Sequence, residues 1–160
     1  MTIQRLAAFA VLAVLAVLAA APCASAQSAR GFAFGGMMSE GYSDWFPAFG
    51  GGAVVDLGQP WVSAGAQGEA FMSWPYFAGR GAVFAQGNLL ARKPVRPFVL
   101  AGVGFGEDGG TLVGAGLEVR SPDTRMGFRV AVEDYLTRRS DLYGQLPAVH
   151  RIALRAGVLF

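Results

Sequence analysis

Cysteine and histidine are nearly missing from this sequence, which contains one of each. Cys23 precedes the segment that we expect to be the mature chain, so that segment has no disulfide, no thiolate nucleophile and no cysteine ligand for a metal. His150 is the one imidazole, and the residue two positions later on the same face of a strand is Ile152 rather than serine. Because nucleophilic catalysis needs a nucleophile beside its base, we predict no catalytic residue, no metal site and no cofactor.

Charged residues are also scarce, at 15% of the chain against about 25% in a typical soluble domain. The 13 basic and 11 acidic residues nearly cancel, so the sequence shows no basic patch for binding nucleic acid. At the same time 53% of the residues are hydrophobic and 23 are glycines. A chain of this composition is expected to place part of its apolar surface against a nonaqueous neighbour.

A long hydrophobic run lies at the amino-terminus, where Arg5 precedes the apolar residues 6–21. This run is shorter than the ~20 residues that a membrane-spanning helix needs. It is followed by Ala24-Ser25-Ala26, which has the small-x-small pattern of a signal-peptidase site. A retained membrane anchor and a lipoprotein acylated on Cys23 are alternatives, although Ala-Pro before Cys23 fits a lipidation site poorly. We therefore assign residues 1–26 to a signal peptide and residues 27–160 to the mature domain.

Helical periodicity is absent after the signal peptide, because no window combines apolar residues at three-and-four spacing with capping residues. Segments of about ten residues instead alternate apolar residues with polar or small ones, as strands do. Strands joined by short connections are antiparallel neighbours, so we expect an all-β, eight-stranded antiparallel up-and-down barrel. The expected strands are 30–38, 47–57, 61–74, 80–91, 96–105, 111–120, 126–136 and 149–160. Short turns near 58–60, 92–94 and 121–123 are expected at one end, and longer loops at 39–46, 75–79, 106–110 and 137–147 at the other.

The last segment, 149–160, alternates throughout and ends on an aromatic residue. One of its faces is uncharged and carries Ile152, Leu154, Ala156, Val158 and Phe160. This ending resembles the carboxy-terminal assembly signal of bacterial outer-membrane β-barrels. The resemblance implies that the barrel-assembly machinery recognises this strand.

Two internal phrases, Arg96–Gly104 and Gly114–Arg120, together with Phe160 and the eight expected strands, make the mature chain similar to the small outer-membrane β-barrel proteins of the OmpA/OmpX type. The resemblance implies a monomeric transmembrane barrel in the bacterial outer membrane, surrounded by outer-membrane lipid. It says little about activity, because function depends on sites rather than on the fold. We therefore expect a non-enzymatic barrel with a structural or surface-interaction role.

Alternation alone does not say which face of each strand points inward. In the membrane orientation, the apolar faces meet lipid and aromatic residues near the strand ends form two girdles. The expected girdles are Phe34, Phe128 and Phe160 on the periplasmic side, and Phe49, Trp74 and Phe105 on the outer side.

The opposite faces carry charges of both signs: Glu69, Glu118, Arg120, Arg129, Glu133, Arg151 and Arg155. In a narrow lumen these groups can pair, whereas isolated buried charges would each cost several kcal/mol. Because eight strands enclose little more than their own side chains, we predict a lumen plugged by this charge network and no substantial pore.

Two alternatives stay open. If the charged faces met water instead, the chain would be a soluble, lipocalin-like ligand-binding barrel of the periplasm. If His150 acted on lipid headgroups at the outer rim, the chain would be a lipid-modifying barrel enzyme, although the histidine and serine pair of barrel lipid A deacylases is absent. Aromatic residues in two expected outer loops would either anchor the barrel at the headgroup level or touch a ligand: Trp45, Phe46, Trp74, Tyr76 and Phe77.

Overall fold

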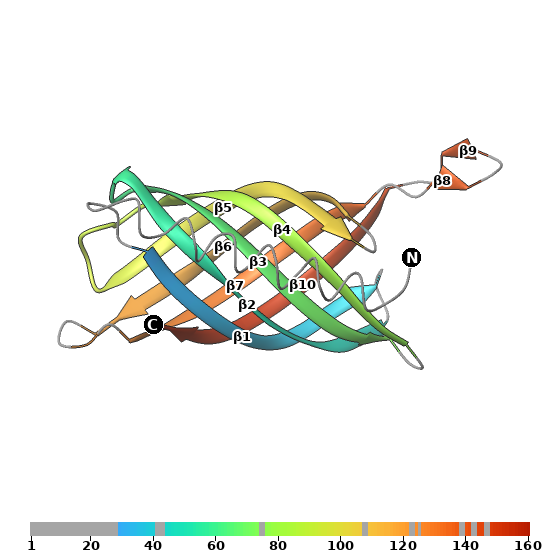
Figure 1. The fold of residues 1–160 in the computed structure, drawn as a ribbon, viewed down its shortest axis with the longest axis horizontal. Helices are drawn as coiled ribbons and strands as arrows, with labels where there is room; N and C mark the ends of the chain where they lie inside the picture. Colours follow the sequence, from blue (N-terminus) through green and yellow to red (C-terminus); the bar gives the residue numbers. More distant parts are fainter. Residues whose placement is uncertain are drawn as a thin grey trace.

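The computed structural model shows a closed β-barrel, drawn with its long axis horizontal in Figure 1. It describes residues 29–40, 44–73, 76–106, 109–121, 124, 126–137, 140–141, 144–145 and 148–160. The barrel strands are β1 (Ala29–Glu40), β2 (Asp44–Gln59), β3 (Val62–Ser73), β4 (Tyr76–Asn88), β5 (Val95–Gly106), β6 (Gly110–Arg120), β7 (Gly127–Thr137) and β10 (Val149–Leu159). The short strands β8 (Ser140–Asp141) and β9 (Gly144–Gln145) pair only with each other. The predicted all-β, eight-stranded antiparallel barrel is therefore confirmed.

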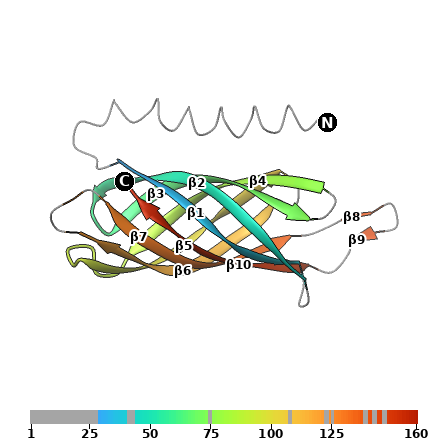
Figure 2. The same cartoon turned by 90° about the horizontal axis from the view of Figure 1, so that it is seen from below.

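The barrel closes because its first and last strands pair. Around the wall the strand order is β1-β10-β7-β6-β5-β4-β3-β2, and each strand is antiparallel to its neighbours. At the seam, Phe32 lies opposite Leu159 and Met38 lies opposite Ala153. Figure 2 shows β1 beside β10 in a second view. The described residues include no helix that is long and apolar enough to cross a membrane.

The two ends of the barrel carry different connections. We call the end where β1 begins and β10 stops the Phe160 end, and the opposite end the β8–β9 end, from which that hairpin projects (Figure 1). The connections β2–β3, β4–β5 and β6–β7 lie at the Phe160 end. In the first of them Gly58 has a φ of 74°, a conformation that glycine adopts without strain.

The predicted contrast between longer loops and short turns is wrong for the β1–β2 and β3–β4 connections, whereas the β7–β10 connection is long as predicted. Within the expected loop 39–46, Ser39 pairs with Trp45 and Glu40 pairs with Asp44, so β1 and β2 extend into it. The expected loop 75–79 is mostly β4, and Phe77 pairs with Met72 of β3. Backbone pairing in a hairpin does not require the apolar alternation from which the strands were predicted, and this is why their ends were missed. The expected loop 137–147 contains β8 and β9.

Glycine allows the strands and the interior side chains to approach closely. A Cβ on Gly36 would overlap the backbone carbonyl of Leu154 in β10. A Cβ on Gly116 would overlap the backbone carbonyl of Val130 and the ring of Phe98. These glycines therefore let the small barrel close and leave interior volume for large side chains.

Candidate functional site: the charged interior of the barrel

The outer and inner faces of the barrel differ in chemistry. Alternate side chains of the described wall point outward, and most of these are apolar, such as Val103, Val130 and Leu154. The positions between them point inward and include buried glutamates and arginines as well as aromatic rings. The charged faces therefore point into the barrel, whereas the lipocalin-like alternative would place them on its exterior.

The structure places all seven predicted lumen charges on the inner face. Arg120 lies near the Phe160 end, where its side chain is partly exposed. The other six are buried: Glu69, Glu118, Arg129, Glu133, Arg151 and Arg155.

Arg155 of β10 joins two glutamates from opposite sides of the wall. Its Nη1 donates to Glu133 Oε2 and its Nη2 donates to Glu69 Oε2, each at 2.6 Å. Gln67 adds a neutral contact, because its Nε2 donates to Glu133 Oε2 at 2.8 Å and to the hydroxyl oxygen of Tyr135 at 2.9 Å. Strands β3, β7 and β10 are thereby connected across the lumen.

Aromatic rings shield the interior guanidinium groups. Arg80 donates from Nε to Glu69, and its guanidinium carbon lies 3.3 Å from the centre of the Tyr135 ring. Arg129 lies over Phe98 at 4.0 Å. Such contacts favour arginine because its planar cation can stack on a ring while its edge donates hydrogen bonds.

A second network lies nearer the Phe160 end. Glu118 accepts from Arg129 Nη1 at 2.6 Å and from Arg120 Nη2 at 2.6 Å. Gln86 donates to Glu118 at 3.2 Å and accepts from Arg129 at 2.9 Å. Asn88 also accepts a hydrogen bond from Gln86, at 2.7 Å.

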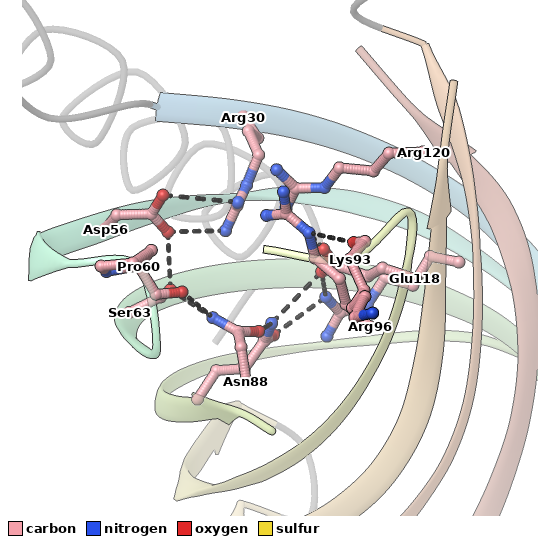
Figure 3. Close-up of polar contacts among 11 residues, drawn as sticks. Arg30, Asp56, Pro60, Ser63, Asn88, Lys93, Arg96, Glu118 and Arg120 are labelled. Carbon is pink, nitrogen blue, oxygen red and sulfur yellow. Dashed lines mark hydrogen bonds and ion pairs between the residues drawn. The ribbon is translucent and has the colours of Figure 1, made fainter. Parts of the chain in front are cut away.

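The same network continues to the rim of the barrel (Figure 3). Asn88 Nδ2 donates to Ser63 Oγ at 3.1 Å, and Ser63 Oγ donates to Asp56 at 2.8 Å. Arg30 Nη2 donates to the same carboxylate at 2.8 Å. Polar contacts therefore run from β1 through β2, β3 and β4 to β6.

The prediction that Phe34 faces lipid is wrong. Phe34 is 9% exposed and belongs to the interior cluster, with the guanidinium carbon of Arg155 4.5 Å from its ring centre. Strand β1 carries apolar residues on both faces, so alternation does not orient it, and its bulky face is the inner one. Arg30 shares the parity of Phe32 and Phe34. Its charge was the signal that this face is the inner one.

Four of the other expected girdle residues are exposed on the outer face: Phe49, Phe105, Phe128 and Phe160. Trp74 lies outside the described residues. The expected loop residues Trp45 and Phe77 are exposed as well, and they lie on strands β2 and β4. The remaining residues of the expected assembly strand are also exposed on the outer face of β10: Ile152, Leu154, Ala156 and Val158.

Several interior polar residues were missed by sequence reasoning: Arg30, Asp56, Gln67, Arg80, Gln86, Asn88 and Tyr135. Most of these residues either occupy the same alternate positions as the predicted charges on their own strand or lie on a strand face that the sequence already marks as polar. The sequence signal for them is therefore the same alternation, followed to both ends of each strand and applied to uncharged polar residues as well as to charges.

His150 is exposed on the outer face near the β8–β9 end. Its Nδ1 lies 2.7 Å from Asp134 Oδ2. Sequence reasoning did not identify this carboxylate partner, which comes from the neighbouring strand β7. Among the described residues, no group of three or more histidine, cysteine, aspartate or glutamate side chains could hold a metal ion.

Comparison with known proteins identifies the fold and no close relative. No protein-family model matches the chain, and no curated protein matches it in sequence. Among solved structures, it is similar to neisserial surface protein A (NspA), with a TM-score of 0.62 and 12% identity over 84% of this chain and 98% of that one. It is also similar to the N-terminal β-barrel domain of OprF from Pseudomonas aeruginosa, with a TM-score of 0.54 and 16% identity over 82% of this chain and 96% of that one. The predicted resemblance to small eight-stranded outer-membrane barrels is therefore confirmed at the level of the fold.

Proposed function

We propose that the mature chain is a non-enzymatic barrel of the bacterial outer membrane with a structural or surface-interaction role. The observation that carries this proposal is the polarity of the wall, which is apolar outside and ionic inside. In water, such a wall would expose a continuous apolar surface, a feature that soluble monomers avoid. In a bilayer the same surface lies against hydrocarbon.

The length of the strands supports the same proposal. A tilted strand crosses a bilayer with about 9–11 residues, and the barrel strands here have 11 to 16. Closure of the barrel satisfies the backbone hydrogen bonds between strands, which hydrocarbon cannot do.

Export and orientation follow from the sequence features. Residues 1–26 would direct the chain through the inner membrane, and the barrel-assembly machinery would recognise the outer face of β10. The Phe160 end would face the periplasm, and the β8–β9 hairpin would lie outside the cell as a surface for interaction.

The interior network supports a plugged lumen. Glu69, Glu133 and Arg155 bond across the interior from different strands, so a wide channel would have to break buried ion pairs. In planar bilayers we expect the purified barrel to produce no large, stable conductance. Steady openings of porin size would contradict the plug.

A lipid-modifying enzyme is the alternative that the contact between His150 and Asp134 favours, because a carboxylate can orient a catalytic imidazole. No hydroxyl nucleophile contacts His150 among the described residues. We expect no phospholipid or lipid A hydrolysis by the purified protein. Hydrolysis that His150→Ala abolishes would establish the enzyme instead.

Cell fractionation tests the location directly. The protein should sediment with outer membranes, resist extraction by salt and dissolve in detergent. In unheated gels it should migrate apart from the heated sample, since a closed barrel resists unfolding by the gel detergent. Recovery in the periplasmic extract without detergent would contradict the membrane proposal.

A further inference from the structure

Three arginines converge on the mouth of the lumen at the Phe160 end. Arg30 is the second residue of β1, Arg96 is the second residue of β5, and Arg120 ends β6. Figure 3 shows their guanidinium groups pointing toward the same space at the rim. We call these three residues the mouth cluster.

Among the described residues, the side-chain carboxylates around the mouth cluster are fewer than the guanidinium groups. Arg30 pairs with Asp56, and Arg120 pairs with Glu118, which also binds Arg129 deeper in the lumen. Arg96 donates from Nε to the backbone oxygen of Lys93 at 3.0 Å and pairs with no carboxylate in the described part of the barrel. Four guanidinium groups therefore share two side-chain carboxylates in this region of the described chain.

Two further observations indicate unused binding capacity. The Nε atoms of Arg30 and Arg120 are buried without a hydrogen-bond partner among the described residues. Arg96 lies near enough to Arg30 and Arg120 to be repelled by them, and near enough to Glu118 and Asp56 to be attracted by them. A bound anion would offset the repulsion among these like charges.

The mouth cluster can be reached from solution. The side chains of Arg30 and Arg120 are 11% and 21% exposed to solvent, and Arg96 is half-buried. A small anion can therefore enter without displacing the buried network around Glu133.

We propose that the mouth cluster is a binding site for a phosphate-class oxyanion. Guanidinium forks donate paired hydrogen bonds to phosphate oxygens, and the surplus positive charge matches the charge of the ligand. The phosphate group can come from free phosphate or from a lipid headgroup. This site goes beyond the proposed function. Because it is built from residues at the mouth of the lumen, it does not depend on whether the barrel lies in a membrane.

Calorimetric titration of the detergent-purified protein tests the site. One arm adds inorganic phosphate in maltoside micelles, and the other adds dihexanoyl phosphatidic acid against dihexanoyl glycerol as the phosphate-free control. Arg96→Gln should weaken the saturable binding by about tenfold or more, since hydrogen bonds to charged groups are strong. Arg96 has no carboxylate partner among the described residues, so its replacement leaves no buried acid unpaired. Arg92→Gln removes the same charge from an exposed position in the turn before β5 and should leave binding unchanged.

The mobility of each variant in unheated gels shows whether it is folded. Arg96→Lys keeps the positive charge but loses the forked guanidinium group, so it should bind with intermediate affinity. Saturable binding of inorganic phosphate assigns a free anion, and binding of phosphatidic acid alone assigns a lipid headgroup. The inference is overturned if neither probe binds, if folded Arg96→Gln and Arg96→Lys bind as tightly as the unaltered protein, or if Arg92→Gln weakens binding equally. That last result would show an attraction to net charge only.

Discussion

Phe160 and Gly31 exchange both of their backbone hydrogen bonds across the seam of the barrel. The nitrogen of Gly31 lies 2.9 Å from the oxygen of Phe160, and the nitrogen of Phe160 lies 3.0 Å from the oxygen of Gly31. The ring of Phe160 also occupies the space that a Cβ on Gly31 would need. The residue that ends the expected assembly signal thus fastens β10 to β1.

Adding a methyl group at Gly31 should reveal this contact. Gly31→Ala forces the Phe160 ring to move, and we expect the free energy of unfolding to fall by about 1 kcal/mol. In a Phe160→Ala background the space is free, so the same change should cost little. Urea unfolding of the four proteins, followed by tryptophan fluorescence, measures the coupling. Equal costs in both backgrounds would show that the ring does not cover Gly31.

Neighbouring glycines of β1 should respond oppositely to alanine. A Cβ on Gly36 would overlap backbone atoms of β10, whereas a Cβ on Gly35 meets nothing within 4 Å. We expect Gly36→Ala to lower the free energy of unfolding by roughly 1–3 kcal/mol. Gly35→Ala should leave it unchanged or raise it by up to about 1 kcal/mol, because alanine restricts the unfolded chain. Urea titrations of the two variants decide this, and similar losses in both would contradict the close approach at Gly36.

The fold was predictable because a strand exposes its chemistry at a period of two. Glu118 and Arg129 lie opposite each other on β6 and β7, and each differs in polarity from both of its sequence neighbours. Where this contrast exists, parity assigns the inner face correctly. Phe34 shows where it fails, because most of β1 is apolar on both faces and only Arg30, near its start, marks the inner one.

The contacts inside the barrel were beyond sequence reasoning for a different reason. Gln67 bonds Glu133 and Tyr135 from a strand that is not adjacent to theirs in the wall. Such contacts depend on the diameter of the barrel and on the stagger between strands, neither of which is visible in one strand. The pair of Asp134 and His150 was closer to prediction, since both lie on the outer faces of adjacent strands.

Two carboxylates that are adjacent in sequence but lie on opposite faces of the wall should differ in their contribution to stability. Glu133 is buried and accepts from Arg155, whereas Asp134 lies on the outer face beside an exposed histidine. Glu133→Gln leaves a buried guanidinium short of a partner, so we expect a loss of roughly 3–5 kcal/mol. Asp134→Asn should cost about 0–1 kcal/mol. Urea unfolding in the same detergent compares them, and a small loss for Glu133→Gln would show that the interior charges are solvated.

A single arginine placed on the outer wall distinguishes hydrocarbon from water around the barrel. Val132 is exposed in the middle of β7, between Ala115 and Leu154 of the adjacent strands, and Leu89 is exposed in the β4–β5 turn at the Phe160 end. If the wall lies in a bilayer, Val132→Arg should destabilise the folded protein by about 2–4 kcal/mol, whereas Leu89→Arg near the interface should cost about 0–1 kcal/mol. Folding equilibria in lipid vesicles measure both changes. Equal and negligible costs would mean that water surrounds the middle of the wall, and this would contradict the membrane proposal while leaving the mouth cluster unaffected.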